Sequence, residues 1–387
     1  MKIGLILSHK GVNYGMLLQA YATQKYIESK GVETEIINVK EGNKISRITK
    51  KILRYFSPVA LKAAFKKAKR RRVVNKDPII KGAFAKRRTV GLDFVKNRLH
   101  DMKVFNSFNE ATEYSKSNYS CVMIGSDQQW APACFYSKLN TLMFVPVGVK
   151  RASYATSMGV SVIPATTHSI LKRFISKMDY ISVREETGKA IICNVTGRED
   201  VTVVPDPTFL LTREEWSRYI PDERIENDEY IFCYFLGDSE EPVKKVMDYA
   251  RKTNKKAIFV RNIESYSSKK VNYEEATVLD APTVEEFINY IRHASLVCTD
   301  SFHCTVFSII NNTQFATFYR TQSTNKDSRN SRIDDLLLRF ECTGRICNND
   351  ATLLNVVSNE INFEKINQKI SSTRAIGENF LKEIIYE

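Results

Sequence analysis

The sequence predicts an α/β protein made of two Rossmann-like domains with a central cleft. Three observations support this prediction. Short apolar runs alternate with helical segments along the chain, Pro205-Asp206-Pro207 interrupts the alternation before it starts again, and 387 residues are enough for two domains. Because strands separated by helices are typical of parallel sheets, each half of the chain is expected to form a doubly wound sheet.

The first half of the chain contains the longer of the two alternating blocks. Its expected strands are residues 2–8, 33–39, 119–124, 151–155, 181–184 and 201–204, and its expected helices are 14–29, 79–99 and 165–177. Gly31 follows the first of these helices, where a glycine commonly ends a helix in the left-handed conformation. We therefore assign residues 1–220 to an N-terminal domain.

A second block begins at the apolar run 229–236. Its further expected strands are 256–260, 295–299 and 314–318, and its expected helices are 240–253, 283–293, 302–311 and 361–385. These elements predict a C-terminal domain at 221–365 and a C-terminal helix at 366–387. The simplest arrangement places a functional site in the cleft between the two domains.

Positive charge is concentrated in one stretch of the first half. Residues 47–76 contain twelve Lys or Arg and no acidic residue, in a chain of formal net charge +14. Apolar residues interleave with the basic ones near helical spacing, so we predict a basic helical insert at about 44–76. One interpretation is a solvated helical hairpin. We favour a surface for anionic lipid, where each basic residue contributes about 1 kcal/mol. The aromatic residues resemble packing residues more than a nucleic-acid stacking platform, so we expect no nucleic-acid partner.

The cysteines and apolar runs suggest a cytoplasmic protein. The eight cysteines form no Cys-x-x-Cys pair, and no apolar run approaches the roughly 20 residues of a transmembrane helix. The apolar stretch at residues 3–7 is short for a signal peptide. We therefore expect a cytoplasmic location, with peripheral contact at the inner face of the plasma membrane as a further hypothesis, and we expect no metal site or bound cofactor.

Two strand-to-helix turns of the first domain carry polar groups. Asn13 and Gly15 lie in the turn after the first strand, which is equally consistent with a structural turn and a ligand loop. Ser126, Asp127 and Gln128 follow the apolar strand 119–124. Trp130, two residues further on, is predicted to be a flat apolar wall for a sugar ring. The alternative for Asp127 is a helix cap, and we favour a functional role.

Two further turns carry charged groups. Arg184 leaves a strand at the start of a helix and can hold a carboxylate or phosphate, although an ion pair with a neighbouring glutamate is the simpler interpretation. Asp300, Ser301, Phe302 and His303 place a carboxylate, a hydroxyl and an imidazole at a helix N-terminus, where anions are favoured. This last turn is the strongest functional prediction.

Taken in order, these segments resemble the polysaccharide pyruvyl transferase family. The matching segments are Asn13-Tyr14-Gly15 with residues 18–22, then residues 125–130, 151–155, 182–185, 206–208, 299–303 and 331–333. The resemblance extends to about residue 340, and the basic insert lies outside it. It implies a glycosyltransferase-B-like fold and transfer of pyruvate from phosphoenolpyruvate onto two hydroxyls of a glycan sugar, with a hexose such as galactose expected, forming a cyclic ketal in surface or capsular polysaccharide.

The resemblance also implies roles for individual residues. Arg184 and His303 are expected to bind phosphoenolpyruvate, the co-substrate, and His303 is expected to donate a proton; Asp127 or Asp300 is the expected general base. Some members carry an arginine where Ser301 stands here, so the second anion ligand stays open between Arg332 and Lys10. The other expected substrate-binding residues are Asn13, Gly15, Ser126, Gln128, Trp130, Ser301, Phe302 and Arg332.

Two other functions remain as alternatives. One is a glycosyltransferase that uses a nucleotide sugar in the same cleft. The other is a non-enzymatic protein that binds anionic lipid through residues 47–76. For the favoured pyruvyltransferase, we expect a glycan acceptor, with linkage to undecaprenyl diphosphate as a hypothesis because lipid-linked acceptors are presented at an anionic leaflet.

Overall fold

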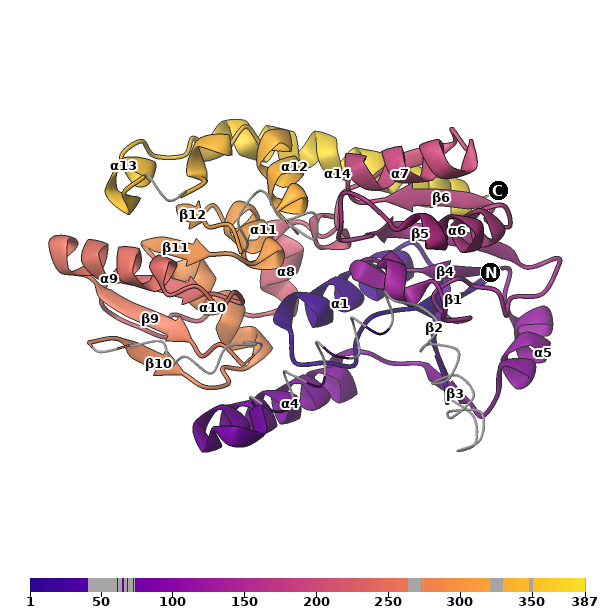
Figure 1. Ribbon diagram of the computed structural model, residues 1–387, viewed down its shortest axis with the longest axis horizontal. Coiled ribbons are helices and arrows are strands. Elements are labelled where there is room, and N and C mark those ends of the chain that lie inside the picture. The colour runs from indigo at the N-terminus through magenta and orange to yellow at the C-terminus, as the bar shows by residue number, and fades with distance from the viewer. Residues whose placement is uncertain are drawn as a thin grey trace.

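The computed structural model contains two parallel sheets, each with helices on its faces (Figure 1). It describes residues 1–40, 74–263, 275–320, 330–347 and 351–386, together with positions 61, 65, 68, 72 and 273. The predicted basic insert at about 44–76 lies almost entirely outside the described residues. None of the helices within the described part of the chain combines the length and apolarity that crossing a bilayer requires.

The first sheet has seven parallel strands in the order β3-β2-β1-β4-β5-β6-β7. The strands are β1 Lys2–Ile6, β2 Glu33–Val39, β3 Met102–Phe105, β4 Cys121–Ile124, β5 Lys150–Thr156, β6 Tyr180–Val183 and β7 Val201–Val203. The accompanying helices are α1 Tyr14–Ser29, α4 Pro78–Arg98, α5 Phe108–Asn118, α6 His168–Ile175 and α7 Glu186–Thr196. The strand order reverses between β1 and β4, so the loops after these strands diverge and leave room for a ligand.

The second sheet has five parallel strands in the order β10-β9-β8-β11-β12. The strands are β8 Tyr230–Tyr234, β9 Lys256–Val260, β10 Thr277–Leu279, β11 Leu296–Thr299 and β12 Phe315–Thr317. The helices from here on are α8 Arg213–Tyr219, α9 Glu241–Thr253, α10 Val284–His293, α11 Phe302–Ile310, α12 Ser331–Arg339, α13 Leu353–Val357 and α14 Phe363–Tyr386. The strand order reverses between β8 and β11, and α14 returns to the first domain, where Arg374 donates to the Phe209 carbonyl at 2.9 Å.

These two sheets confirm the predicted α/β fold with two Rossmann-like domains. The predicted boundary at residue 220 falls between β7 and β8. Several predicted elements have the observed limits: α1, β2 and β9 begin and end at the expected residues. The short strands β3 and β10 and the helices α5, α8, α12 and α13 were not predicted.

The first helix joins the two domains. The Tyr14 hydroxyl at the start of α1 donates to the Pro282 carbonyl at 2.6 Å, and the Tyr14 ring stacks on Phe287 of α10 with centroids 4.3 Å apart. Arg87 of α4, buried at 1 % exposure, donates to the carbonyls of Arg261 and Asp280, both at 2.8 Å. Both contacts connect the first domain to the second beside the cleft.

Candidate functional site

A single buried carboxylate connects the two domains at the centre of the site. Asp206 follows β7 and is 1 % exposed. Its Oδ2 accepts hydrogen bonds from Arg184 Nη1 at 2.7 Å and Ser126 Oγ at 2.9 Å, and it lies 3.3 Å from His303 Nε2 of the second domain. Its Oδ1 accepts from the Thr208 backbone N–H and hydroxyl at 3.1 and 2.8 Å. Thus Arg184 and His303, predicted from separate halves of the chain, meet at one oxygen atom.

The surroundings keep this carboxylate ionised. Burial alone would raise the pKa of Asp206, but the charge and contact of His303, together with Arg184, outweigh it and hold that pKa well below its usual range. Burial lowers the pKa of Arg184, whereas the charges of Glu185, Asp206 and Asp127 raise it more. The Arg184–Asp206 ion pair is therefore fully charged at neutral pH.

Arg184 is held on several sides and keeps one donor group open. Its Nε donates to Glu185 Oε1 at 3.0 Å, so the simpler interpretation of an ion pair with a neighbouring glutamate is also realised. The guanidinium lies over the Phe302 ring, 4.1 Å from its centroid. Nη2 is buried and has no hydrogen-bond partner among the described residues. A buried, unpartnered guanidinium nitrogen is suited to an anionic ligand.

His303 occupies the second position of α11 and packs directly on α1. The side chain is nearly buried, and Nε2, which lies 3.3 Å from Asp206 Oδ2, makes no well-formed hydrogen bond with any residue that the structure describes. A Cβ built on Gly15 would overlap the His303 ring. The structure therefore gives Gly15 a packing role across the domain boundary, and Asn13 caps α1 by accepting from the Met16 N–H at 3.4 Å.

The packing of Gly15 leads to a test. Gly15→Ala is expected to reduce catalysis about tenfold or more and to destabilise the protein, because the new methyl group must displace the His303 ring or separate α1 from α11. Helix propensity alone would predict the opposite, a gain of about 1 kcal/mol. Gly82→Ala in α4 is the matched control, because a Cβ there meets nothing within 4 Å. Turnover and urea unfolding of both variants measure the difference, and equal behaviour would refute the packing role.

Phe302 lies between two guanidinium groups. Besides Arg184, it faces Arg332 of α12, whose guanidinium carbon is 5.9 Å from the ring centroid. With its amide oxygen oriented toward Arg332, Gln128 accepts from both terminal nitrogens of that side chain at 3.1 and 3.2 Å. Ser301 is buried beside Phe302, and its backbone N–H donates to Thr299 Oγ1 at 3.0 Å. The structure thus gathers Gln128, Ser301, Phe302 and Arg332 around the Arg184–Asp206 pair.

The two aspartates expected as general bases have different surroundings. Asp300 accepts the backbone N–H groups of Leu236 and Gly237 at 2.8 and 2.7 Å, and Arg320 lies 3.6 Å from Oδ1. Asp127 is half-buried at the end of β4, with φ at +74°, and its carboxylate makes no hydrogen bond with the described residues. Positive φ is strained for a residue with a side chain and often occurs at functional positions. The contacts of Asp300 favour a structural role, and those of Asp127 leave its oxygens open.

Trp130 does not form the expected wall of a sugar site. Its side chain is fully buried, Nε1 donates to the Asn140 carbonyl at 3.0 Å, and its ring packs on Phe174 with centroids 5.5 Å apart. The prediction of substrate contact for Trp130 is therefore wrong. An aromatic residue after a polar turn is equally consistent with a sugar-binding surface and with a hydrophobic core, and Trp130 lies in the core.

Sequence reasoning also missed the central residue. Asp206 was noted for its flanking prolines and was part of the family resemblance, but it was not predicted as a site residue. The available signal was its position directly after the strand 201–204, since the same rule identified Asp127 and Arg184. Of the two residues proposed for the second anion ligand, Arg332 lies at the site. Lys10 lies in the turn between β1 and α1, where burial lowers the pKa of its side chain.

Comparisons with solved structures agree with this fold. A UDP-N-acetylglucosamine 2-epimerase from Rickettsia bellii superposes with a TM-score of 0.55 at 10 % identity, covering 100 % of this chain and 96 % of that one. A UDP-GlcNAc 2-epimerase from Methanocaldococcus jannaschii gives 0.51 at 12 % identity, covering both chains completely. At such identities the likeness concerns the fold, which is glycosyltransferase-B-like.

Sequence comparison gives the family. No curated protein is significantly similar to the chain. The family profile described as polysaccharide pyruvyl transferase matches residues 13–322, which include Asp127, Arg184, Asp206 and His303. The match spans most of the chain and both sheets, and so this protein belongs to the polysaccharide pyruvyl transferase family.

Proposed function

We propose that this protein transfers pyruvate from phosphoenolpyruvate to two hydroxyls of one glycan sugar, with a galactose-type hexose as the first acceptor to test. The observation that carries the proposal is the meeting of Arg184 and His303 at Asp206, with Arg184 Nη2 left open between the two domains. Phosphoenolpyruvate carries a carboxylate and a phosphate, and guanidinium groups bind both through paired N–H donors. Membership of the family supports this function.

The reaction needs proton transfers that the site residues can supply. One sugar hydroxyl adds to C2 of the enol, C3 receives a proton and becomes a methyl group, and the second hydroxyl displaces phosphate at C2. The products are the cyclic ketal and inorganic phosphate, and the two hydroxyl protons end on the methyl group and on phosphate. Arg184 and the N-terminus of α11 would stabilise the departing phosphate.

We assign the proton donor and the base to different domains. His303 would donate the proton to C3, and Asp206, beside its Nε2, would orient the ring. Asp127 would accept a hydroxyl proton, and its carboxylate, which makes no hydrogen bond with the described residues, supports this role. Asp300 accepts two backbone N–H groups of the loop after β8, which supports a role in positioning that loop. Each proton transfer of this kind typically contributes about 10²–10⁴-fold to the rate.

Mass spectrometry of glycans incubated with the protein tests the proposal. With phosphoenolpyruvate, an acceptor should gain the mass of one pyruvate less one water, and one phosphate should be released for each ketal. Transfer of a hexose from a nucleotide sugar, with no reaction of phosphoenolpyruvate, would instead establish the glycosyltransferase alternative and refute the pyruvyltransferase.

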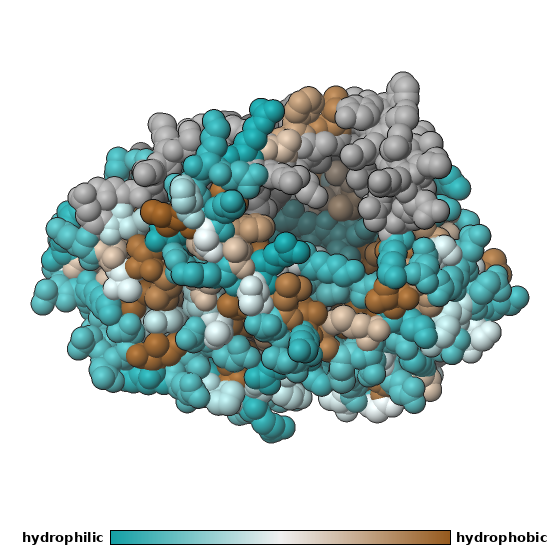
Figure 2. Space-filling model, turned by 90° about the horizontal axis from the view of Figure 1, so that it is seen from below, coloured by the Kyte–Doolittle hydropathy of each residue, from teal (hydrophilic) through white to brown (hydrophobic). Residues whose placement is uncertain are grey.

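We further propose that the enzyme works in the cytoplasm at an anionic membrane surface, on an acceptor linked to undecaprenyl diphosphate. Supporting this proposal, α4 continues the basic stretch with the exposed residues Lys81, Arg88 and Lys96 beside exposed Ile79 and Leu92. Seen from the α4 side, the surface is mostly hydrophilic with scattered apolar residues (Figure 2). Vesicles containing phosphatidylglycerol should bind the protein at low salt and release it at high salt. Equal binding to phosphatidylcholine vesicles would reject the proposal.

A further inference from the structure

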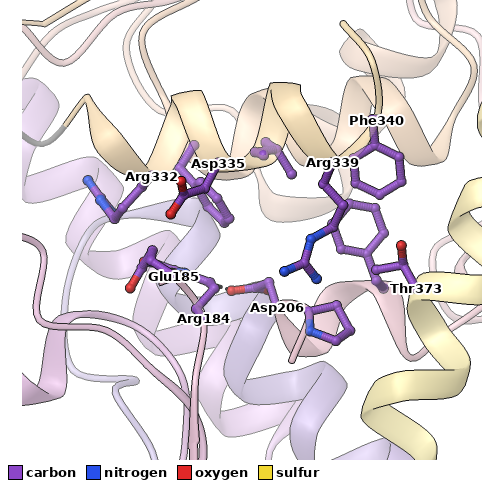
Figure 3. A pocket seen from close by; sticks show the side chains of 12 residues that line it. Arg184, Glu185, Asp206, Arg332, Asp335, Arg339, Phe340 and Thr373 are labelled. Carbon is purple, nitrogen blue, oxygen red and sulfur yellow. Dashed lines mark hydrogen bonds and ion pairs between the residues drawn. The ribbon is translucent and has the colours of Figure 1, made fainter. Parts of the chain in front are cut away.

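A charged cavity lies behind the Arg184–Asp206 pair, between the two domains. The enclosed space is small, about 20 Å³, and it opens toward solvent. The first domain contributes Arg184, Glu185 and Asp206 to its lining, and α12 of the second domain contributes Arg332, Asp335 and Arg339. The three α12 residues follow a spacing of three and four, which places them on one face of the helix. Figure 3 shows this face directed at the strand ends that carry Arg184 and Asp206.

Arg339 is the distinctive group in this cavity. Its guanidinium points into the space between α12 and Asp206 (Figure 3) and makes no hydrogen bond or ion pair with the described residues. Burial lowers the pKa of Arg339, although the nearby charges of Glu186 and Asp335 act in the other direction. A half-buried cation without a partner is costly, because the protein replaces only part of its hydration.

A second guanidinium group lines the same cavity. Arg184, whose side chain is 2 % exposed, leaves its buried Nη2 without a hydrogen-bond partner among the described residues. Arg184 and Arg339 belong to different domains and line one cavity, so a ligand between them would contact both. Two guanidinium groups converging on one space match a compact oxyanion such as a carboxylate or a phosphate.

We propose that Arg339 is a cationic ligand for the donor substrate, and that together with Arg184 it binds one of the two anionic groups of phosphoenolpyruvate in this cavity. The inference rests on the proposed function. Arg339 is not among the site residues that the sequence predicts. It also differs from Arg332 and Lys10, the two residues predicted as candidates for the second anion ligand. The inference also requires both domains for donor binding, since Arg184 and Arg339 come from opposite sides of the cleft.

Asp335 provides a second test, in which the substitution is expected to strengthen phosphoenolpyruvate binding and not to weaken it. Its Oδ2 is buried without a hydrogen-bond partner, and its carboxyl faces Glu185 and Glu186 of the first domain as well as Asp334 of its own helix. Burial and then these charges raise the pKa of Asp335 to about 6, so at pH 7.5 it is mostly ionised. A negative group at the edge of the cavity opposes an incoming anion, and its removal should strengthen binding.

The experiment measures phosphoenolpyruvate affinity by titration calorimetry on the full-length protein at pH 7.5. Arg339→Gln is expected to raise the dissociation constant about ten- to a hundredfold, the usual effect of losing a hydrogen bond to a charged group. Asp335→Asn is expected to lower it about threefold or more. Arg218→Gln is the control: it also removes one positive charge, but from an exposed position on α8 outside the cavity, and its affinity should equal that of the wild type.

The outcomes separate this inference from the proposed function. If wild type binds phosphoenolpyruvate and Arg339→Gln binds it equally well, Arg339 is not a ligand and the proposed function stands. If wild type does not bind phosphoenolpyruvate, the proposed function fails and the inference fails with it. Thermal unfolding reports whether Arg339→Gln remains folded. Should it not, Arg339→Lys keeps the charge but lacks the paired N–H donors, and wild-type affinity in that variant would overturn the inference.

Discussion

Asp206→Ala should lower pyruvyl transfer by about a thousandfold and destabilise the protein by about 3–5 kcal/mol. The stability loss follows because Arg184, whose side chain is 2 % exposed, would keep its charge and lose its closest partner. The activity loss follows because Asp206 Oδ2 also faces His303 Nε2 and accepts from Ser126. Urea unfolding and the rate of phosphate release from phosphoenolpyruvate in the presence of acceptor measure the two effects.

Asp206→Asn removes the negative charge of the side chain and keeps its shape, so it isolates the contribution of the charge to stability. Because the pKa of folded Asp206 is depressed, its ionisation contributes stability above the unfolded pKa of about 4, and this contribution is lost as the pH falls through the folded pKa. The difference in unfolding free energy between wild type and Asp206→Asn should therefore be full at pH 7 and shrink below pH 4. A difference that stays constant down to pH 2.5 would show that the charged pair does not stabilise the fold.

His303→Ala is expected to lower pyruvyl transfer at least about a hundredfold while the protein remains folded. The imidazole supplies the proposed proton donor, and loss of such a group typically costs 10²–10⁴-fold. The loss should appear mainly in kcat, since proton donation acts in the transition state. Steady-state kinetics together with a thermal unfolding curve make the measurement.

His168→Ala is the matched control for this substitution. His168 begins α6, on the first domain, and takes no part in the contacts around Asp206. It should retain wild-type turnover. If folded His303→Ala also turns over at the wild-type rate, His303 has no catalytic role, and the assignment of proton donation must move to another group.

The elements that the sequence predicted well are those whose local signals agree. Residues 14–29 follow a capping Asn13, and Gly31 has φ at +75°, as a glycine after a helix end should. The edge strands β3 and β10 have four and three residues and are mostly only half-buried, so they show no apolar run. Helix α12 was missed although the buried residues Ile333, Leu336, Leu337 and Phe340 follow helical spacing, because it has only nine residues.

The site was predicted in its parts and not in its assembly. Arg184, Ser126 and His303 were identified because each follows a strand, which is a local property of the chain. Their convergence on Asp206 depends on how the two domains are oriented, and sequence periodicity contains no such information. The same limit explains Gly15, whose neighbour across the domain boundary is His303, and Trp130, whose burial depends on Phe174, forty-four positions away.

The stacking of Tyr14 on Phe287 has a consequence for engineering this enzyme. The second domain contributes the imidazole at Asp206 and the first contributes the guanidinium, and the aromatic pair lies at the contact between the two domains. Neither half expressed alone can therefore retain a working centre. A chimaera that exchanges halves with another pyruvyl transferase to alter its glycan preference has to transplant both aromatic partners together.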